Sequence, residues 1–293
     1  MIYYNNNHMA NDDEQREMCN MGLFSSNYNR PGPGVPKDAP AKKGIPRFFE
    51  IFIRDFGMLW RANFITMLCF IPCFIALIIG QAFSEYIGMV LICSLVFVLG
   101  CCLAGPALTA LFGVTVKSVR DIPGYMWHDY KKYFASNIKQ SIPAGIISMV
   151  LIAMDFIMVN FYLTQEGNSR YVLLALVFFG VIVITGCSIY CFLQILFIDL
   201  PLPAILKNSL MLMFGYVKRS LPATLIGIVF LVAMLGVISW PFAIMLAFFF
   251  GLPVFVLVII CMWTWPIMDK TFNITQLQKD KEERENATNI EKE

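Results

Sequence analysis

Asp155 and Arg170 are the ionisable residues best placed for chemistry inside the apolar part of the chain. Asp155 lies well within one apolar stretch, and Arg170 opens the next one. Ionisable groups in such stretches usually pair with one another or mark proton and cation sites. We expect the two side chains to form an ion pair that joins neighbouring helices. A proton or cation site at Asp155 is the alternative.

The other residues that could do chemistry do not combine into an active site. His8 and His128 lie in separate polar segments, and the sequence contains no Ser-His-Asp set, no glycine-rich phosphate loop and no paired acids within an apolar stretch. Of the nine cysteines, Cys69 with Cys73 and Cys187 with Cys191 form pairs at helical spacing, but no histidine or carboxylate accompanies either pair to complete a zinc site. The sequence therefore predicts no catalytic residue, cofactor or metal, and we interpret the cysteines as small packing residues.

Six long apolar stretches must position these residues. They cover residues 63–83, 86–111, 141–163, 171–198, 221–240 and 241–266. A helix of about 20 residues crosses the roughly 30 Å of hydrocarbon in a membrane. With 58% hydrophobic and 14% charged residues, the chain is more apolar than a soluble domain of this length requires. The sequence predicts an all-α polytopic membrane protein with a bundle of six transmembrane helices.

The basic residues orient this bundle. Of the 22 Lys and Arg residues, 21 lie on one side of the six-span arrangement, and Arg170 alone lies on the other. Positive charge near the ends of spans is retained in the cytoplasm during insertion. We therefore expect both termini in the cytoplasm (N-in, C-in) of a multi-pass protein of the cell membrane. Its basic cytoplasmic face would lie against anionic lipid headgroups.

Polar and amphipathic segments flank the predicted bundle. Phe49, Phe52 and Phe56 recur at helical spacing opposite Glu50 and Arg54, which is typical of a helix lying on the membrane surface. The predicted order is a disordered cytoplasmic tail (1–46), an interfacial amphipathic helix (47–61), a six-helix transmembrane domain (62–268) and a polar cytoplasmic tail (269–293).

A second amphipathic pattern lies between the second and third apolar stretches. Trp127, Tyr130 and Phe134 recur at helical spacing, with Lys131 and Lys132 beside them. The pattern predicts a short surface helix docked either on the bundle or on another protein. Because aromatic and basic side chains are frequent in protein interfaces, we treat these five residues as a candidate docking site for a partner.

Two short stretches resemble each other and suggest an internal repeat. Residues 139–144 read Lys-Gln-Ser-Ile-Pro-Ala, and residues 218–223 read Lys-Arg-Ser-Leu-Pro-Ala. Each opens a predicted span that runs from inside to outside. Two parallel repeats of span, cytoplasmic helix and span would explain the pattern, and repeats are common in transporters. A proline that begins a span after a basic residue is also common in membrane proteins, so coincidence is the alternative.

Several motifs, taken in order, resemble the YesL family of Gram-positive bacterial membrane proteins. They occupy residues 28–35, 47–50, 105–111, 127–130 and 134, and 137–141. The resemblance extends from about Met21 to the end of the sixth apolar stretch. The first 20 residues lie outside it, which favours translation starting at Met21. The family has no assigned catalytic residues, and its members are often encoded beside systems for carbohydrate uptake and polysaccharide degradation.

These observations favour a non-enzymatic accessory or regulatory membrane protein associated with carbohydrate uptake, with a membrane transporter as its partner. We predict no nucleic-acid partner. A small-solute transporter in its own right is the alternative, and a membrane enzyme is a more distant one. A carrier needs polar groups that converge near the middle of the bilayer, and the apolar stretches offer few beyond Thr185, Ser188 and Gln194.

Overall fold

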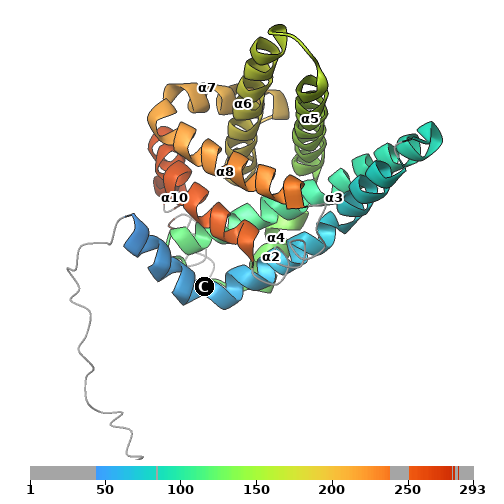
Figure 1. Cartoon of the computed structure of the whole chain (residues 1–293). Helices are drawn as coiled ribbons and strands as arrows, with labels where there is room; N and C mark the ends of the chain where they lie inside the picture. Colours follow the sequence, from blue (N-terminus) through green and yellow to red (C-terminus); the bar gives the residue numbers. More distant parts are fainter. Residues whose placement is uncertain (1–43, 84, 238–250, 279, 281–282, 284–293) are drawn as a thin grey trace, which may run out of the picture. The chain divides into compact units, whose positions relative to one another are not determined.

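The computed structural model describes residues 44–83, 85–237, 251–278, 280 and 283. Contacts divide the chain into two units, 1–43 and 44–293, and every described residue belongs to the second unit. The predicted tail 1–46 therefore lies almost entirely outside the described residues. All regular structure in the described part is helical (Figure 1), which confirms the all-α fold class.

The described helices match most of the predicted spans. In chain order they are α2 (Ile45–Ala82), α3 (Ile87–Val119), α4 (Met126–Ser136), α5 (Ile138–Thr164), α6 (Ser169–Phe197), α7 (Leu202–Gly215), α8 (Val217–Val237) and α10 (Leu252–Phe272). Among them α2, α3, α5, α6 and α10 are each long and apolar enough to cross a membrane. The pair α7 and α8, bent by 107°, makes a sixth if it counts as one span. The chain is thus a membrane-embedded helical protein with five or six such helices.

The predicted interfacial helix 47–61 is not a separate element. It forms the first part of α2, which runs without a break from Ile45 to Ala82. The boundary predicted at residue 61 is absent because residues 58–71 contain neither glycine nor proline, so nothing in that stretch interrupts the helical hydrogen bonds.

The end of the bundle also differs from the prediction. Residues 241–250 of the predicted sixth span lie outside the described residues, and α10 begins after Gly251, whose backbone is left-handed (φ 65°). The predicted polar tail 269–293 starts too early, because α10 continues to Phe272 and the next residues form a short helical stretch. Ile274 in that stretch is buried and belongs to the main hydrophobic core. Ile274 and the partly buried Phe272 hold the start of this tail on the bundle.

The long helices pack as three successive pairs in a cyclic order. Helix α2 packs on α3, α5 packs on α6, and α8 packs on α10. Each pair then meets the next one, through α3 with α5, α6 with α8, and α10 with α2. Helix α3 also contacts both α6 and α10, so it lies at the centre of the arrangement. Figure 1 shows the α2–α3 and α5–α6 pairs as two hairpins whose tips point away from the rest of the unit.

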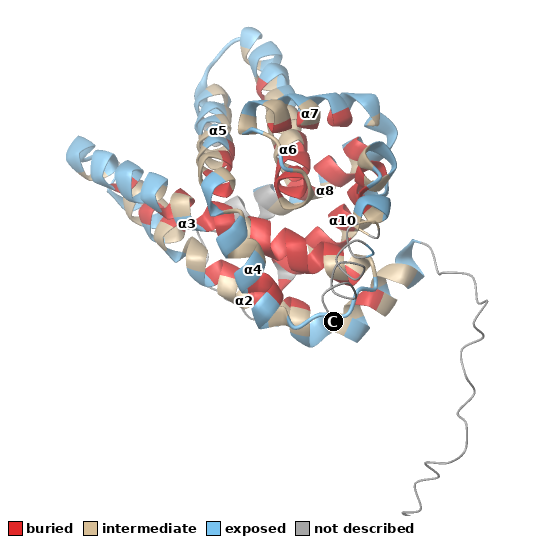
Figure 2. Ribbon diagram, turned by 180° about the vertical axis from the view of Figure 1, so that it is seen from behind, coloured by how far each residue is buried: buried red, intermediate tan, exposed pale blue. Residues whose placement is uncertain are grey.

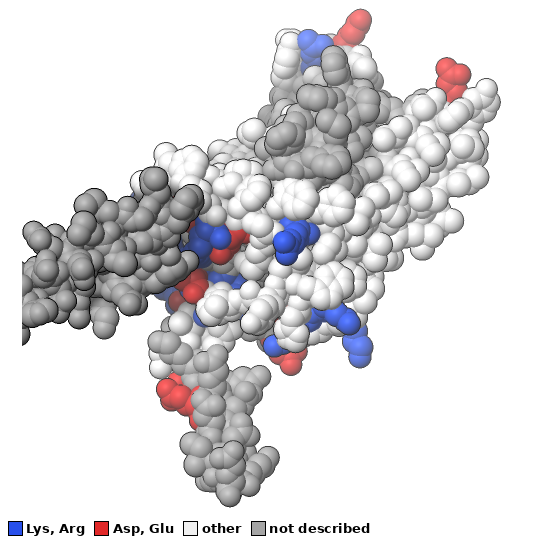
Figure 3. All heavy atoms as spheres, turned by 90° about the horizontal axis from the view of Figure 1, so that it is seen from below, with Lys and Arg blue, Asp and Glu red and all other residues white. Residues whose placement is uncertain are grey.

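Side-chain contacts join the helix ends and connections on the side of the bundle away from these hairpin tips. These contacts include Arg47 with Val119, Arg120 with Gln278, Gln140 with Leu200, and Thr271 with Tyr216. We call this the basic end, because nearly all the described Lys and Arg residues lie in the helix ends, short helices and connections on this side. In Figure 3 most of the visible Lys and Arg atoms lie in the middle and lower part of the view, and one further group lies at the upper edge.

Burial is concentrated toward the basic end. In α3 the buried side chains run almost continuously from Gly100 to Ser118, whereas nearly all residues from Ile87 to Leu99 are exposed or half-buried. Figure 2 shows the same gradient, with buried residues next to α4 and exposed ones toward the hairpin tip. The exposed parts of the hairpins are apolar, so lipid rather than water is the solvent that suits them.

Candidate functional site

Helix α4 is fixed to the bundle by polar contacts on its inner side. Lys117 of α3 lies 2.8 Å from the carboxylate of Asp129, and both side chains are largely buried. The hydroxyl of Tyr130 lies 2.9 Å from that of Thr66 in α2 and donates to the carbonyl of Ala107 at 3.4 Å. Tyr130 is only 3% exposed, and burial raises the pKa of its hydroxyl. These bonds stabilise α4 because buried polar groups are costly when they lack partners.

A glycine allows α4 to approach α3 closely. A Cβ atom on Gly113 would lie 2.5 Å from the ring of Tyr133, nearer than two carbon atoms can approach. The ring of Tyr133 therefore occupies the space that a side chain at position 113 would need. Together with the Lys117–Asp129 pair, this contact sets which face of α4 points away from the bundle.

The predicted docking residues consequently divide into two groups. Tyr130 and Phe134 lie on the inner side of α4, where their rings pack together with centroids 6.4 Å apart. They hold α4 on the bundle, which is one of the two arrangements the sequence left open. Trp127 is 62% exposed, and Lys131 and Lys132 are exposed as well. We call Trp127, Lys131 and Lys132 the α4 outer face.

An ionic cluster that the sequence did not suggest joins α2 to the end of α3. Arg47 and Arg54 both donate to the carboxylate of Asp121, two residues after the end of α3. Arg54 also donates to the carbonyl of Ser118 at 2.8 Å, and the hydroxyl of Ser118 donates to Asp55. We call Arg47, Arg54 and Asp121 the arginine clamp. A hint was available in the sequence, because Arg47 and Arg54 are two helical turns apart and share one face of α2.

The electrostatics of the arginine clamp suit its place at a helix end. The carbonyl groups at a helix C-terminus carry partial negative charge, which attracts cationic side chains. Partial burial alone would raise the pKa of the Asp121 carboxyl, but the hydrogen bonds and charges of Arg54 and Arg47 outweigh it, so this pKa lies below its ordinary value. Asp121 also has a left-handed backbone (φ 58°), a conformation that aspartate tolerates better than most residues.

Asp155 and Arg170 do not form the predicted ion pair. Helix α5 continues past Asp155 to Thr164, about 14 Å at 1.5 Å per residue, and Arg170 lies beyond that end. The residue of α6 beside Asp155 is Gly180, where a Cβ atom would lie 3.6 Å from the carboxylate. Arg170 instead donates to the carbonyl of Gln165 at 3.2 Å and stacks on the ring of Tyr171. The prediction was wrong because the α5–α6 hairpin holds the two side chains at different depths.

The two similar stretches found in the sequence occupy similar positions in the structure. In the first, the hydroxyl of Thr109 in α3 donates to that of Ser141 in α5 at 2.9 Å. In the second, the hydroxyls of Tyr190 in α6 and Ser220 in α8 lie 2.7 Å apart. Ser141 and Ser220 are both buried, two residues before the proline of their helix. Each therefore binds its own helix to the long helix that precedes it.

A glycine stands one turn before the hydroxyl-bearing residue in both long helices. Gly105 lies against the backbone of Ser141 and Gly145, where a Cβ atom would be 2.3 Å from the Ser141 carbonyl oxygen. Gly186 lies against the side chains of Met213 and Thr224. Small residues at such crossings let membrane helices approach closely. The two crossings thus share a plan, although the first is a backbone contact and the second a side-chain contact.

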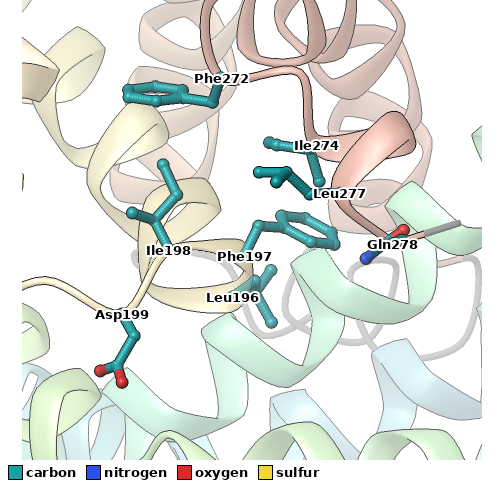
Figure 4. A pocket seen from close by; sticks show the side chains of 8 residues that line it. All are labelled: Leu196, Phe197, Ile198, Asp199, Phe272, Ile274, Leu277 and Gln278. Atoms are coloured by element: carbon teal, nitrogen blue, oxygen red, sulfur yellow. The ribbon is translucent and has the colours of Figure 1, made fainter. Parts of the chain in front are cut away.

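A shallow hollow of about 420 Å³ lies between the end of α6 and the segment after α10 (Figure 4). Most of its lining is apolar, with Asp199 at one side and Gln278 at the other. The amide oxygen of Gln278 already accepts a hydrogen bond from Arg120 at 2.7 Å. The lining residues are Leu196, Phe197, Ile198, Asp199, Phe272, Ile274, Leu277 and Gln278. Such a lining suits an apolar side chain or ligand but holds no catalytic arrangement.

The cysteines of the described residues do not gather into a metal-binding group. The eight cysteines there are all free thiols. No group of three or more His, Cys, Asp or Glu side chains among the described residues is arranged to hold a metal ion. Cys73 and Cys101 instead pack with Ala104 in a small apolar cluster between α2 and α3.

Comparison of the chain with protein-family models, with curated proteins and with solved structures gave no match. The YesL resemblance therefore remains an expectation based on sequence. A function for the protein has to be inferred from its sequence and from the geometry of the described helices.

Proposed function

We propose that the protein is a non-enzymatic accessory or regulatory component of carbohydrate uptake in the cell membrane, with both termini in the cytoplasm. Its partner in this proposal is a membrane transporter. The α4 outer face carries the proposal. Exposed aromatic and basic side chains are usual in protein interfaces, and the anchoring of α4 by Asp129 and Tyr130 holds this face in a fixed orientation.

The distribution of charge supports the proposed orientation. At the basic end, the stretch from the last turn of α3 to the first turn of α5 carries five bases: Lys117, Arg120, Lys131, Lys132 and Lys139. The α5–α6 tip carries one, Arg170. Positive charge is retained on the cytoplasmic side and attracts anionic headgroups. Alkaline phosphatase fused after Glu85 or Gly167 should be active, and fused after Lys131 it should be inactive. Activity after Lys131 would refute this orientation.

The docking role is tested by copurification from gently solubilised membranes. The triple change Trp127→Ala, Lys131→Glu and Lys132→Glu should release a copurifying sugar transporter. Tyr130 must be left intact in this experiment, because its loss would loosen α4 itself. A matched control is Lys207→Glu with Met211→Ala, two exposed residues of α7, which should retain the transporter. Equal retention by both variants would contradict the proposal.

A small-solute carrier is the second candidate, and the repeated arrangement of the helices favours it. Helices α3, α4 and α5 follow the same plan as α6, α7 and α8, including the paired hydroxyls at Ser141 and Ser220. Repeats of this kind are widespread among transporters. Purified protein in liposomes would then move a sugar or an ion unaided. If that movement survived the triple change on α4, the accessory function should be abandoned.

A further inference from the structure

Asp155 is an acidic side chain in the apolar part of α5, and none of the ion pairs in the described structure includes it. Its Oδ2 atom is buried, and no hydrogen-bond donor among the described residues reaches it. It lies beside Gly180 of α6, on the side of α5 that faces the neighbouring helix. A carboxylate in hydrocarbon without a counter-charge is strongly unfavourable, so such groups pair or become neutral.

The chain itself supplies no counter-charge at this depth. None of the residues 62–116, 141–169, 171–206 and 220–269, which make up the apolar parts of the long helices, is a Lys, Arg or His. Arg170 is engaged with Gln165 and Tyr171 at the tip of the hairpin. It is also about 15 Å along α6 from Gly180, which is too far for its side chain to reach. A basic side chain that pairs with Asp155 would therefore have to come from another molecule.

The surface around Asp155 is suited to a second helix. One turn on either side of Asp155, Leu151 and Met158 share its face of α5 and are 39% and 41% exposed. One turn before Gly180, Leu176 of α6 is 67% exposed. Gly180 has no side chain, so it leaves space between these larger residues. Small residues between large ones are typical of sites where membrane helices approach each other closely.

We infer that Asp155 is the contact point for a transmembrane helix of a partner protein that carries a Lys or Arg at the matching depth. If the helix enters the hydrocarbon at Ser141, Asp155 lies about 21 Å along it. In a hydrocarbon layer of roughly 30 Å, this places the carboxylate about 9 Å below the outer boundary. The partner's ammonium or guanidinium group would bind the carboxylate, and its apolar residues would cover the exposed side chains of α5 and α6. Uptake of a proton by Asp155 is the competing way to neutralise it.

A synthetic probe helix tests this contact in the full-length protein. The probe is a polyleucine transmembrane peptide with one lysine at the matching depth, labelled for energy transfer to protein in liposomes. The control peptide has leucine at that position. We expect the lysine peptide to bind about tenfold more tightly than the control, which is the effect expected of one polar contact between membrane helices. Asp155→Asn should abolish that difference, whereas Glu166→Gln at the hairpin tip should preserve it.

Each result of this experiment decides the inference. Equal binding of the two peptides, or a preference for lysine that survives Asp155→Asn, would overturn it and leave the proton as the neutralising group. The identity of the natural partner rests on the proposed accessory function. Binding of the probe helix does not, because the probe replaces that partner. Loss of the partner in the α4 triple variant concerns the proposed function alone, so the two failures can be told apart.

Discussion

Helices α3–α4–α5 and α6–α7–α8 form two three-helix units with the same plan and different chemistry. Each unit has a long helix, a short helix at the basic end, a one-residue break at Asn137 or Tyr216, and a second long helix with a buried serine near its start. In the first unit the short helix is held by an ion pair and a buried tyrosine. In the second it is held mainly by apolar side chains, together with a hydrogen bond from Gln194 to Ser209.

The outward faces of the two short helices differ accordingly. Helix α7 exposes Leu210, Met211 and Phe214, whereas α4 exposes Trp127 and two lysines. An apolar outer face suits contact with lipid, and an aromatic and basic face suits the membrane surface or a protein partner. The comparison shows how one backbone arrangement can support two surfaces, because the inner contacts that fix each helix are independent of what it presents outward.

The largest expected difference between the units is at their glycine crossings. Gly105→Ala places a Cβ atom against the backbone of Ser141 and Gly145, which cannot move aside without separating α3 from α5. Gly186→Ala meets the side chains of Met213 and Thr224, and the flexible Met213 can adjust. We expect a loss of about 3 kcal/mol or more for the first and about 1 kcal/mol for the second. Thermal unfolding in detergent measures both, and equal losses would contradict the difference proposed between the units.

A second difference concerns the ion pair that fixes α4. Lys117→Met leaves the buried carboxylate of Asp129 without its partner, and we expect a loss of about 2–3 kcal/mol. Lys207→Met on α7 removes an exposed lysine and should change stability by less than about 0.5 kcal/mol. Adding Asp129→Leu to Lys117→Met should restore much of the loss, because no uncompensated charge then remains. Failure of that rescue in thermal unfolding would show that the pair does not act through charge.

The buried serines should differ in the opposite order. Ser220→Ala removes the partner of the buried Tyr190 hydroxyl and should cost about 1–2 kcal/mol. Ser141→Ala should cost less than about 1 kcal/mol, because the Thr109 hydroxyl can still donate to the carbonyl of Gly105 at 3.1 Å. Unfolding of the two single variants side by side tests this order. A larger loss for Ser141→Ala would mean that the two serines play different parts.

The smallest expected effect is the pH dependence of the arginine clamp, which joins α2 to the segment after α3 in the first unit. The pKa of Asp121 is lowered in the folded protein. Its contribution to stability is therefore complete above the unfolded value of about 3.9 and is lost as the pH falls through the lowered folded value. Because Asp121 is about half exposed, the contribution should be about 1 kcal/mol at most. Asp121→Asn should remove this dependence between pH 5 and about pH 3, and an unchanged pH profile would contradict the clamp.

The apolar stretches predicted the long helices well, since helix length in a membrane depends on local composition. The amphipathic pattern of residues 127–134 likewise predicted α4. The pattern could not show which aromatic residues face the bundle. The rotation of α4 depends on the contacts of Tyr130 with Thr66 and of Asp129 with Lys117, which lie in other helices. The continuity of α2 was missed because the pattern changes from amphipathic to apolar within one unbroken helix.

By itself the sequence determined the fold class, the number of long apolar segments to within one, and the uneven distribution of basic residues. These properties follow from composition along short stretches of chain. The tertiary structure alone decided that Asp155 and Arg170 stay apart, that Tyr130 is buried while Trp127 is exposed, and that Asp121 binds two arginines of α2. Each of these depends on the depth and rotation at which helices far apart in sequence meet, and backbone contacts such as the one at Gly105 set that geometry.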